Sequence, residues 1–240
     1  EVARELPDKT EIQVPITLSK EEMAICEVLR REAKAQLETD KSVSVNALSM
    51  ITRLREAACS AALVEKQWHS NSSKLEAMTD KLQPLLEQGN RVLIFSQFTS
   101  FLQMAKETIL QQGITDILYL DGSTPLKQRQ WMVDDFQAGK ARVFLISLKA
   151  GGLGLNLTGA NYVIHLDPWW NPAIEQQATD RAYRIGQKQK VTVYHIIAEH
   201  TIEEKILRLH QTKQSLADSL LDGTNMSHKL TTKDLLELLS

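Results

Sequence analysis

The side chains best suited to phosphate chemistry in this sequence are Gln177, Arg181 and Arg184. Their spacings of four and three residues predict that all three lie close to one face of a helix. Arginines placed in this way can stabilise negative charge that develops on a phosphate during its transfer. The alternative is a pair of surface arginines that cap a solvated helix or bind local acids such as Asp180.

A glycine-rich turn and an aromatic loop precede these three residues. The turn contains three glycines between positions 151 and 154, and glycines let backbone amides approach a ligand with no Cβ in the way. It follows an apolar run, residues 143–146, and the aromatic loop, residues 167–172, follows another, residues 162–166. Both runs are typical of buried strands. The candidate residues therefore follow strand ends, where open α/β sheets bind ligands, although the glycines could also make a tight turn without a ligand.

Short apolar runs alternate with amphipathic stretches between residues 72 and 199, which predicts a mostly parallel sheet covered by helices on both faces. The expected strands cover residues 92–95, 117–120, 143–146, 162–166 and 191–197, and the expected helices cover residues 73–87, 101–112 and 126–137. Trp131 and Phe136, in the last of these helices, are expected in the core. A dinucleotide-binding turn of the pattern G-x-G-x-x-G does not fit, because position 157 is leucine.

Further elements are expected on both sides of this α/β region. Residues 1–19 predict an extended linker, and Ser19 can cap a helix whose apolar periodicity continues to Leu37. Additional helices are expected over residues 45–64, 201–221 and 232–239.

The order and wording of these motifs resemble the second motor lobe of the Swi/Snf-related ATPases, a branch of helicase superfamily two, and are closest to its prokaryotic members. The matching residues are Trp170-Asn171-Pro172, Gln177-Ala178, Arg181, Arg184 and Gly186-Gln187. The resemblance implies an α/β fold, a RecA-like lobe with a mostly parallel sheet, preceded by a helical protrusion and followed by bracing helices. The implied domains are an inter-lobe linker (1–19), the protrusion (20–71), the helicase C-terminal lobe (72–199) and the bracing helices (200–240).

The sequence departs from the family pattern in the protrusion. The family carries Leu-Arg followed by a sequence similar to Cys-Asn-His-Pro. This chain has Leu54-Arg55 and Cys59, but Ser60, Ala61 and Ala62 follow. The turn after Cys59 is therefore not predicted by the resemblance, and we expect Cys59 to be a small buried hydrophobic residue on a helix.

ATP hydrolysis needs a phosphate-binding loop with a lysine, a hydroxyl and an aspartate for Mg²⁺, and a residue that orients the attacking water. The sequence has no G-x-x-x-x-G-K-[ST] and no Asp-Glu pair at the end of an apolar strand. We therefore expect ATP and Mg²⁺ to be held mainly by an N-terminal lobe. The resemblance implies that Arg184 is the arginine finger, Arg181 its partner on the phosphates, Gln177 a neighbour of the γ-phosphate, and Gly152 and Gly154 neighbours of the sugar.

By the same resemblance, a second group of residues lies along a DNA track. Its members are Ser96, Gln97, Gly122, Ser123, Ser147, Lys149, Trp170 and Asn171. Alternatives stay open: Ser96 and Gln97 can cap the next helix, the loop at Gly122 can simply begin one, and Trp170 can be a hydrophobic plug. Adjacent side chains of an extended segment point to opposite faces, so Trp169 and Trp170 cannot both point inward. Contacts to the DNA backbone predict little sequence preference and marked salt dependence.

Composition limits the compartment and the partners. The chain has 240 residues, of which 42% are hydrophobic and 24% charged, and a net charge of −2, so it lacks a broad basic surface. No apolar run is long enough to span a bilayer, no secretory leader is visible, and the first residue, Glu1, indicates a fragment. Two cysteines are too few for a disulfide framework, and their spacing matches no metal motif. We expect a reducing location, either the cytoplasm near the nucleoid or the nucleus.

Together these features predict the C-terminal motor lobe of an ATP-dependent double-stranded DNA translocase. We expect a monomer that binds double-stranded DNA and the N-terminal RecA-like lobe of the same polypeptide, has no metal site of its own, and is inactive alone as an ATPase. A strand-separating helicase would need a strand-splitting wedge, and none is visible. From another class, the chain could be a DNA- or protein-binding module that has lost ATP coupling, but such a module would not need Gln177, Arg181 and Arg184.

Overall fold

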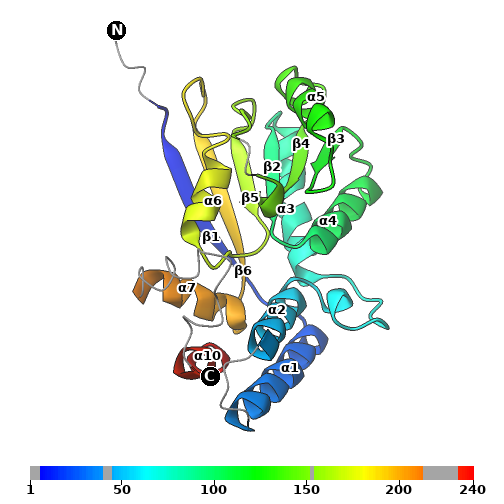
Figure 1. Ribbon diagram of the computed structural model, residues 1–240. Helices are drawn as coiled ribbons and strands as arrows, with labels where there is room; N and C mark the ends of the chain where they lie inside the picture. The colour runs from blue at the N-terminus through cyan, green and yellow to red at the C-terminus, as the bar shows by residue number, and fades with distance from the viewer. Residues whose placement is uncertain (1–5, 40–44, 152–153, 213–231) are drawn as a thin grey trace. The chain divides into compact units, whose positions relative to one another are not determined.

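The computed structural model describes residues 6–39, 45–151, 154–212 and 232–240 (Figure 1). Its contacts divide the chain into two compact units. The sheet unit comprises residues 1–14, 75–167 and 173–196, and the helical unit comprises residues 15–74, 168–172 and 197–240. No helix within the described ranges combines the length and the apolar character that a membrane span requires.

The sheet of the described residues has six strands in the order β1-β6-β5-β2-β4-β3 (Figure 1). They are β1 (Lys9–Ile16), β2 (Val92–Ser96), β3 (Ile117–Leu120), β4 (Val143–Ser147), β5 (Tyr162–His165) and β6 (Val191–Ala198). The pairs β2–β4, β2–β5, β3–β4 and β5–β6 are parallel. The amide of Val191 bonds to the carbonyl of Asp8, and that of Glu199 to Ile16, so β1 and β6 also run in the same direction. The predicted parallel sheet is confirmed.

The central strands are the most deeply buried part of the sheet unit. Every residue of β2 and β4 is buried, as expected for strands with both faces covered. All five predicted strands are present, with ends that differ by one residue at most. Residues 9–16, predicted only as an extended segment, pair with β6 as an edge strand, and their alternating polar pattern suits a half-exposed strand.

Helices α4 (Thr99–Gln111) and α5 (Leu126–Gln137) are close to their predicted bounds. α4 packs against β2 and β4, and α5 packs against β3 (Figure 1). Phe136 is fully buried as predicted, but the prediction for Trp131 is wrong, because its side chain is 71% exposed. Residues 133 and 136 form the buried side of α5, and a residue two positions before 133 projects from the opposite side of a helix.

Helix α6 (Pro172–Thr179) is shorter than predicted and ends before both arginines. The carbonyl of Arg181 accepts a hydrogen bond of 2.9 Å from the distant amide of Leu157. This bond ties the turn after α6 to the segment before β5. The prediction that three functional side chains share one helix face is wrong, since Gln177 lies on α6 while Arg181 and Arg184 lie in the turns after it.

The helical unit contains α1 (Lys20–Thr39), α2 (Val45–Cys59), a short 3₁₀ helix (Ala61–Leu63), α7 (Ile202–Thr212) and α10 (Thr232–Leu239). Ser19 and Glu22 cap α1 reciprocally, because each side chain accepts a hydrogen bond from the other residue's amide. The predicted helix over residues 201–221 is present as α7 up to residue 212, and its remainder lies outside the described residues.

Helix α2 ends five residues earlier than predicted. Ser60 adopts an extended conformation, and its hydroxyl accepts a hydrogen bond from the amide of Ala62, which begins the 3₁₀ helix. Cys59, the last residue of α2, is fully buried as predicted. A serine that bonds the following backbone competes with helix continuation, which explains the early end.

Candidate functional site

Arg181 is a buried residue of the sheet unit. Its side chain is 6% exposed, and its guanidinium carbon lies 5.6 Å from the ring centroid of Phe95 on β2. Burial lowers the pKa of Arg181 to about 10, so the group stays protonated at neutral pH. The positive charge of Arg181 therefore lies inside the sheet unit, near β2.

Arg184 is exposed, in contrast to Arg181. Its Nη1 donates a hydrogen bond of 3.4 Å to the carbonyl of Gly154. This bond brings residues 181–187, the arginine segment, together with the glycine turn. A Cβ at Gly154 would meet nothing within 4 Å, so the chain leaves open space at this position. Gln177 is also exposed, on α6. Gly152, the other predicted glycine of the site, lies outside the described residues.

Gln187 anchors the end of the arginine segment. Its Nε2 donates hydrogen bonds to the carbonyls of Thr158, Ala160 and Ala182, at 3.1, 2.8 and 2.9 Å. Its Oε1 accepts from the two backbone amides that follow it, both at 2.9 Å. This buried side-chain amide ties the segment that contains Arg184 to residues 158 and 160, and the backbone amide of Gln187 donates to the carbonyl of Arg184 at 2.9 Å. From the sequence, Gln187 was identified only as a residue that matches the family motif, with no role assigned to it.

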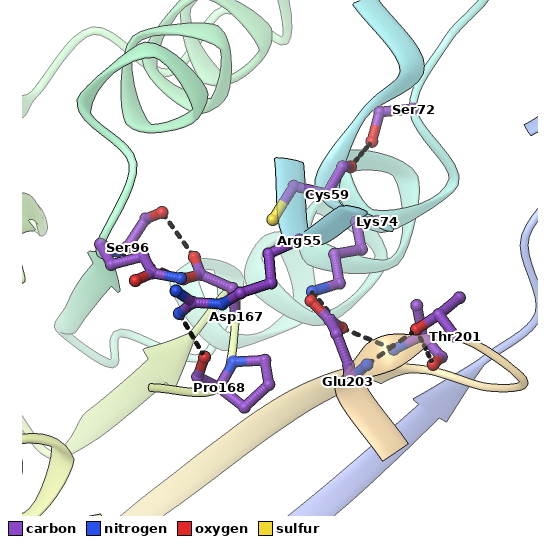
Figure 2. Close-up of polar contacts among 11 residues, drawn as sticks. Arg55, Cys59, Ser72, Lys74, Ser96, Asp167, Pro168, Thr201 and Glu203 are labelled. Atoms are coloured by element: carbon purple, nitrogen blue, oxygen red, sulfur yellow. Dashed lines mark hydrogen bonds and ion pairs between the residues drawn. The ribbon is translucent and has the colours of Figure 1, made fainter. Parts of the chain in front are cut away.

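Ser96 and Asp167 meet where β2 and β5 end (Figure 2). Ser96 donates its hydroxyl proton to the Asp167 carboxylate, which also accepts the amide of Gln97 at 3.3 Å. Both side chains are buried. The Ser96 hydroxyl accepts the amide of Phe98, the N-terminal cap of α4, at 3.1 Å, and α4 has no side-chain cap. Sequence reasoning missed Asp167, whose place directly after a buried strand was the available signal.

The loop after β3 is held by its own side chains. Asp121 Oδ1 accepts the amide and the hydroxyl of Ser123 at 2.8 and 2.6 Å, and Thr124 Oγ1 accepts the amide of Asp121 at 3.1 Å. The hydroxyl of Ser123 is the main cause that lowers the pKa of Asp121. Gly122 and Ser123 are exposed, so this preorganised loop presents them to solvent.

The segment after β4 divides its two candidate residues between interior and surface. Ser147 is buried and is the register partner of Ser96 across the β2–β4 pair. Lys149, in the 3₁₀ turn Leu148–Gly151, is exposed. Two of the predicted DNA-track serines therefore lie side by side at the ends of neighbouring strands, and Lys149 supplies an exposed charge two residues after Ser147.

Trp170 belongs to the core of the helical unit. Its side chain is 7% exposed and packs with residues of α1, α2, α7 and α10. The guanidinium carbon of Arg55 lies 4.8 Å from its ring centroid, and Arg55 also donates to the carbonyl of Pro168 at 3.3 Å (Figure 2). The position matches the hydrophobic plug that the sequence left as an alternative. Trp169 is half-buried, and Asn171 is buried.

Whether the described residues could hold a metal ion, and which candidate residues lie together, follows from their positions in the fold. Within the described ranges, no three histidine, cysteine, aspartate or glutamate side chains gather in a way that could hold a metal ion. The structure thus brings together Arg184 with Gly154 and Ser96 with Ser147. It places Trp170 and Asn171 in a different unit from the other candidates.

The sequence profile of the helicase conserved C-terminal domain matches residues 73–186. The chain is 38% identical over 241 residues to an uncharacterized ATP-dependent helicase of Mycoplasma pneumoniae, a match that covers 99% of this chain and 23% of that protein. It is 42% identical over 172 residues to the chromatin-remodeling ATPase INO80 of Homo sapiens, covering 71% of this chain and 11% of that protein. The chain spans about a quarter of the length of the curated relatives that it matches over almost its whole length.

Solved structures give the same relationship. The SWI2/SNF2 ATPase core of Sulfolobus solfataricus in complex with dsDNA superposes with a TM-score of 0.80 at 30% identity, covering 98% of this chain and 51% of that chain. The C-terminal domain of the same ATPase gives a TM-score of 0.78 at 28% identity, covering 97% of this chain and 100% of that chain. The fold and the site therefore define a helicase C-terminal lobe of the RecA-like type. Within that class, the chain belongs to the Swi/Snf-related ATPases of helicase superfamily two.

Proposed function

We propose that the chain is the C-terminal motor lobe of an ATP-dependent double-stranded DNA translocase, and that it supplies an arginine finger to a nucleotide held by the N-terminal lobe. The observation that supports this most directly is the difference between the two arginines. Arg181 is buried, whereas Arg184 is exposed and its backbone carbonyl accepts the amide of Gln187 at 2.9 Å. An exposed guanidinium on a fixed segment can reach a ligand bound by another domain.

The residues of the site would act as follows. Arg184 stabilises the charge that develops on the γ-phosphate, an effect worth about 10³–10⁵ in rate for arginine fingers. Arg181 adds positive potential from the interior of the sheet unit, where its side chain is buried. Gln177 is exposed and can lie near the γ-phosphate, and Gly154 leaves room for the sugar side.

The residues present fit the outer side of an ATP site rather than its main binding surface. The chain offers an exposed guanidinium and an exposed amide, but it has no phosphate-binding loop sequence. ATP supplies the transferable phosphoryl group, and Mg²⁺ neutralises its charge; both would be held mainly by the N-terminal lobe. The isolated chain would accordingly hydrolyse no ATP.

The DNA track would combine exposed and buried members. Lys149 and Gly122 are exposed and can contact phosphates directly, Lys149 through its charge and Gly122 through its backbone amide. Ser123 is also exposed, but its amide and hydroxyl both donate to Asp121, so it would hold the loop in shape. Ser96, Gln97 and Ser147 are buried and would hold the sheet edge in shape, presenting backbone groups rather than side chains.

The aromatic loop would contribute to the DNA track through its more exposed members. Trp169 is half-buried, whereas the indole of Trp170 lies in the core of the helical unit. We therefore assign an aromatic contact to Trp169 and a supporting role to Trp170. Asn171 is buried and would support the same loop from within. The relative that was solved with dsDNA supports a duplex as the partner.

The division of the chain that we propose keeps the linker (1–19), the helical protrusion (20–71), the helicase C-terminal lobe (72–199) and the bracing helices (200–240). The C-terminal domain of the related SWI2/SNF2 ATPase, which this chain matches over its full length, supports treating these parts as one lobe.

The test is steady-state ATP hydrolysis by the full-length protein without DNA, with single-stranded DNA and with duplex DNA. The proposal predicts strong stimulation by duplex, little dependence on its sequence, and loss of stimulation as salt rises. Hydrolysis that duplex DNA leaves unchanged would favour the ATP-uncoupled binding module. Displacement of one strand of the duplex during hydrolysis would favour the strand-separating helicase.

A further inference from the structure

Arg129 makes an unusual set of contacts for a residue on an exposed helix. It lies in the first part of α5 and is half-buried. Its Nε donates to the carbonyl of Thr124 at 2.8 Å, and its Nη2 donates to the carbonyls of Asp121 and Gly122 at 3.3 and 3.2 Å. Its Nη1 donates to the carbonyl of Ala150 at 3.1 Å. All four acceptors are backbone oxygens.

These acceptors belong to two loops that leave the same edge of the sheet. Residues 121–124 follow β3, and residues 148–151 follow β4. The two strands are parallel neighbours, with Leu120 opposite Ile146 at their ends. Arg129 therefore bridges the loop that presents Gly122 and the turn that presents Lys149.

An arginine is required for such a bridge. The guanidinium is a rigid plane with five N–H donors that point in different directions, whereas the lysine ammonium is a single point with three donors. One arginine can therefore serve four carbonyls of two loops at once. A lysine at position 129 would keep the positive charge but could not hold both loops.

The bridge also sets the direction of the backbone amides. In a planar trans peptide the C=O and N–H bonds point in opposite directions. The carbonyl of Asp121 points toward Arg129, so the amide of Gly122 in the same peptide points away from it. The amide of Gly122 and the exposed Lys149 of the bridged turn both suit a phosphate group. Arg129 itself donates hydrogen bonds to backbone carbonyls of the two loops.

We propose that Arg129 is a positioning residue that ties the 121–124 loop to the 148–151 turn, so that both meet the DNA backbone as one rigid surface. The inference rests on the proposed function for the identity of the ligand. It assigns Arg129 no phosphate contact of its own. Loss of the bridge should therefore weaken duplex binding without changing the number of phosphates that the lobe neutralises.

The first experiment compares the full-length protein with its Arg129→Lys variant. The duplex concentration for half-maximal stimulation of ATP hydrolysis is expected to rise about tenfold, from the loss of two or more backbone hydrogen bonds. The slope of log affinity against log salt should match that of the unmodified protein. Lys149→Ala should flatten this slope by about 0.9, the loss of one phosphate contact. Lys127→Ala, which removes an exposed charge from the same helix, is the control and should change neither quantity.

Amide hydrogen exchange of the same proteins measures directly whether Arg129 stabilises the two loops. In Arg129→Lys, amides of residues 121–124 and 148–151 should exchange faster, while those of β2 and β4 keep their protection. Faster exchange throughout the lobe would mean a general stabilising role and would overturn the proposal. So would unchanged duplex affinity in Arg129→Lys, or a salt slope flattened as in Lys149→Ala, since the latter indicates a direct phosphate contact. If duplex DNA stimulates no hydrolysis even in the unmodified protein, the proposed function fails, and the exchange experiment still decides whether Arg129 couples the loops.

Discussion

Lys74 and Glu203 form an ion pair inside the helical unit: the ammonium nitrogen lies 2.6 Å from a carboxylate oxygen, and the side chains are 0% and 1% exposed (Figure 2). The same carboxylate accepts the amide of Ala198 at 2.9 Å. Bulk water cannot hydrate either charge, so each charged group is stabilised by the opposite charge of the other. The pair joins the first turn of α3 (Ser73–Glu87) to the first turn of α7.

Removing one partner of this pair should strongly destabilise the chain. Lys74→Met leaves a buried, uncompensated carboxylate, so we expect the free energy of unfolding to fall by about 3–5 kcal/mol. The double variant Lys74→Met/Glu203→Gln should lose less than the sum of the single variants, because it leaves no unpaired charge. Urea unfolding of the three variants measures this coupling. A loss below about 1 kcal/mol in either single variant would contradict the prediction.

His165 should make the stability depend on pH. Burial lowers its pKa well below the usual value, and the neighbouring His195 lowers it further. Below the ordinary histidine pKa of about 6.5, the unfolded chain binds a proton at this residue and the folded chain does not. Stability is therefore full above that pH and falls below it, by at most about 1.4 kcal/mol per pH unit.

The measurement is urea unfolding between pH 7.5 and 5.5, where exposed carboxylates stay ionised. His165→Asn should show a shallower loss of stability as the pH falls. The variant His69→Asn, which replaces an exposed histidine, controls for the loss of one imidazole. Burial also lowers the pKa of His210, which should account for part of the slope that remains. Equal slopes for the unmodified chain and His165→Asn would contradict the assignment.

Both cysteines should be unreactive in the folded chain. Burial is the main cause that raises the pKa of Cys26 to about 12, and the carboxylates of Glu203 and Glu22 add to it. Since the thiolate is the reactive form, few Cys26 side chains can react at pH 8. Cys59 is fully buried. Titration with a disulfide-exchange reagent should detect no thiol before denaturant is added and both thiols afterwards. Rapid reaction of either thiol in the native chain would show that the helical unit opens readily.

Gln187 should control the geometry of the arginine segment. Gln187→Leu fills a similar volume but leaves the carbonyls of Thr158, Ala160 and Ala182 without this donor. We expect a loss of about 1–3 kcal/mol in stability from the unsatisfied groups. Because Arg184 is displaced, the full-length protein should also lose kcat with a smaller change in the KM for ATP. A variant with reduced stability and an unchanged kcat would show that Gln187 is only structural.

The sheet was predictable from sequence because its strands carry a local signal. Val143 to Ile146 and Val92 to Phe95 are apolar runs with polar neighbours, and such runs are buried wherever helices cover both faces of a sheet. The candidate site residues come from the family resemblance and stay predictions. The end of α6 was not predictable, and the turn that follows it is held by a hydrogen bond between Arg181 and Leu157, which lie far apart in sequence.

The side-chain contacts within the site could not be predicted from the sequence either. Nothing local distinguishes Arg129 from any helix arginine, and its role appears only when the β3 and β4 loops are neighbours. The same holds for Asp167, which acts through Ser96. Adjacent tryptophans predicted that one side chain would face outward, but only the packing of the helical unit places Trp170 inside.

The proposed function depends most on Arg184, and ATP hydrolysis by the full-length protein carrying Arg184→Ala tests it most directly. We expect duplex-stimulated hydrolysis to fall by about 10³-fold or more while duplex binding persists, because the finger acts on the transition state. Lys188→Ala removes an exposed charge four residues later and should keep the stimulation. Stimulation that survives Arg184→Ala would contradict the finger assignment and with it the proposed role of this lobe in hydrolysis.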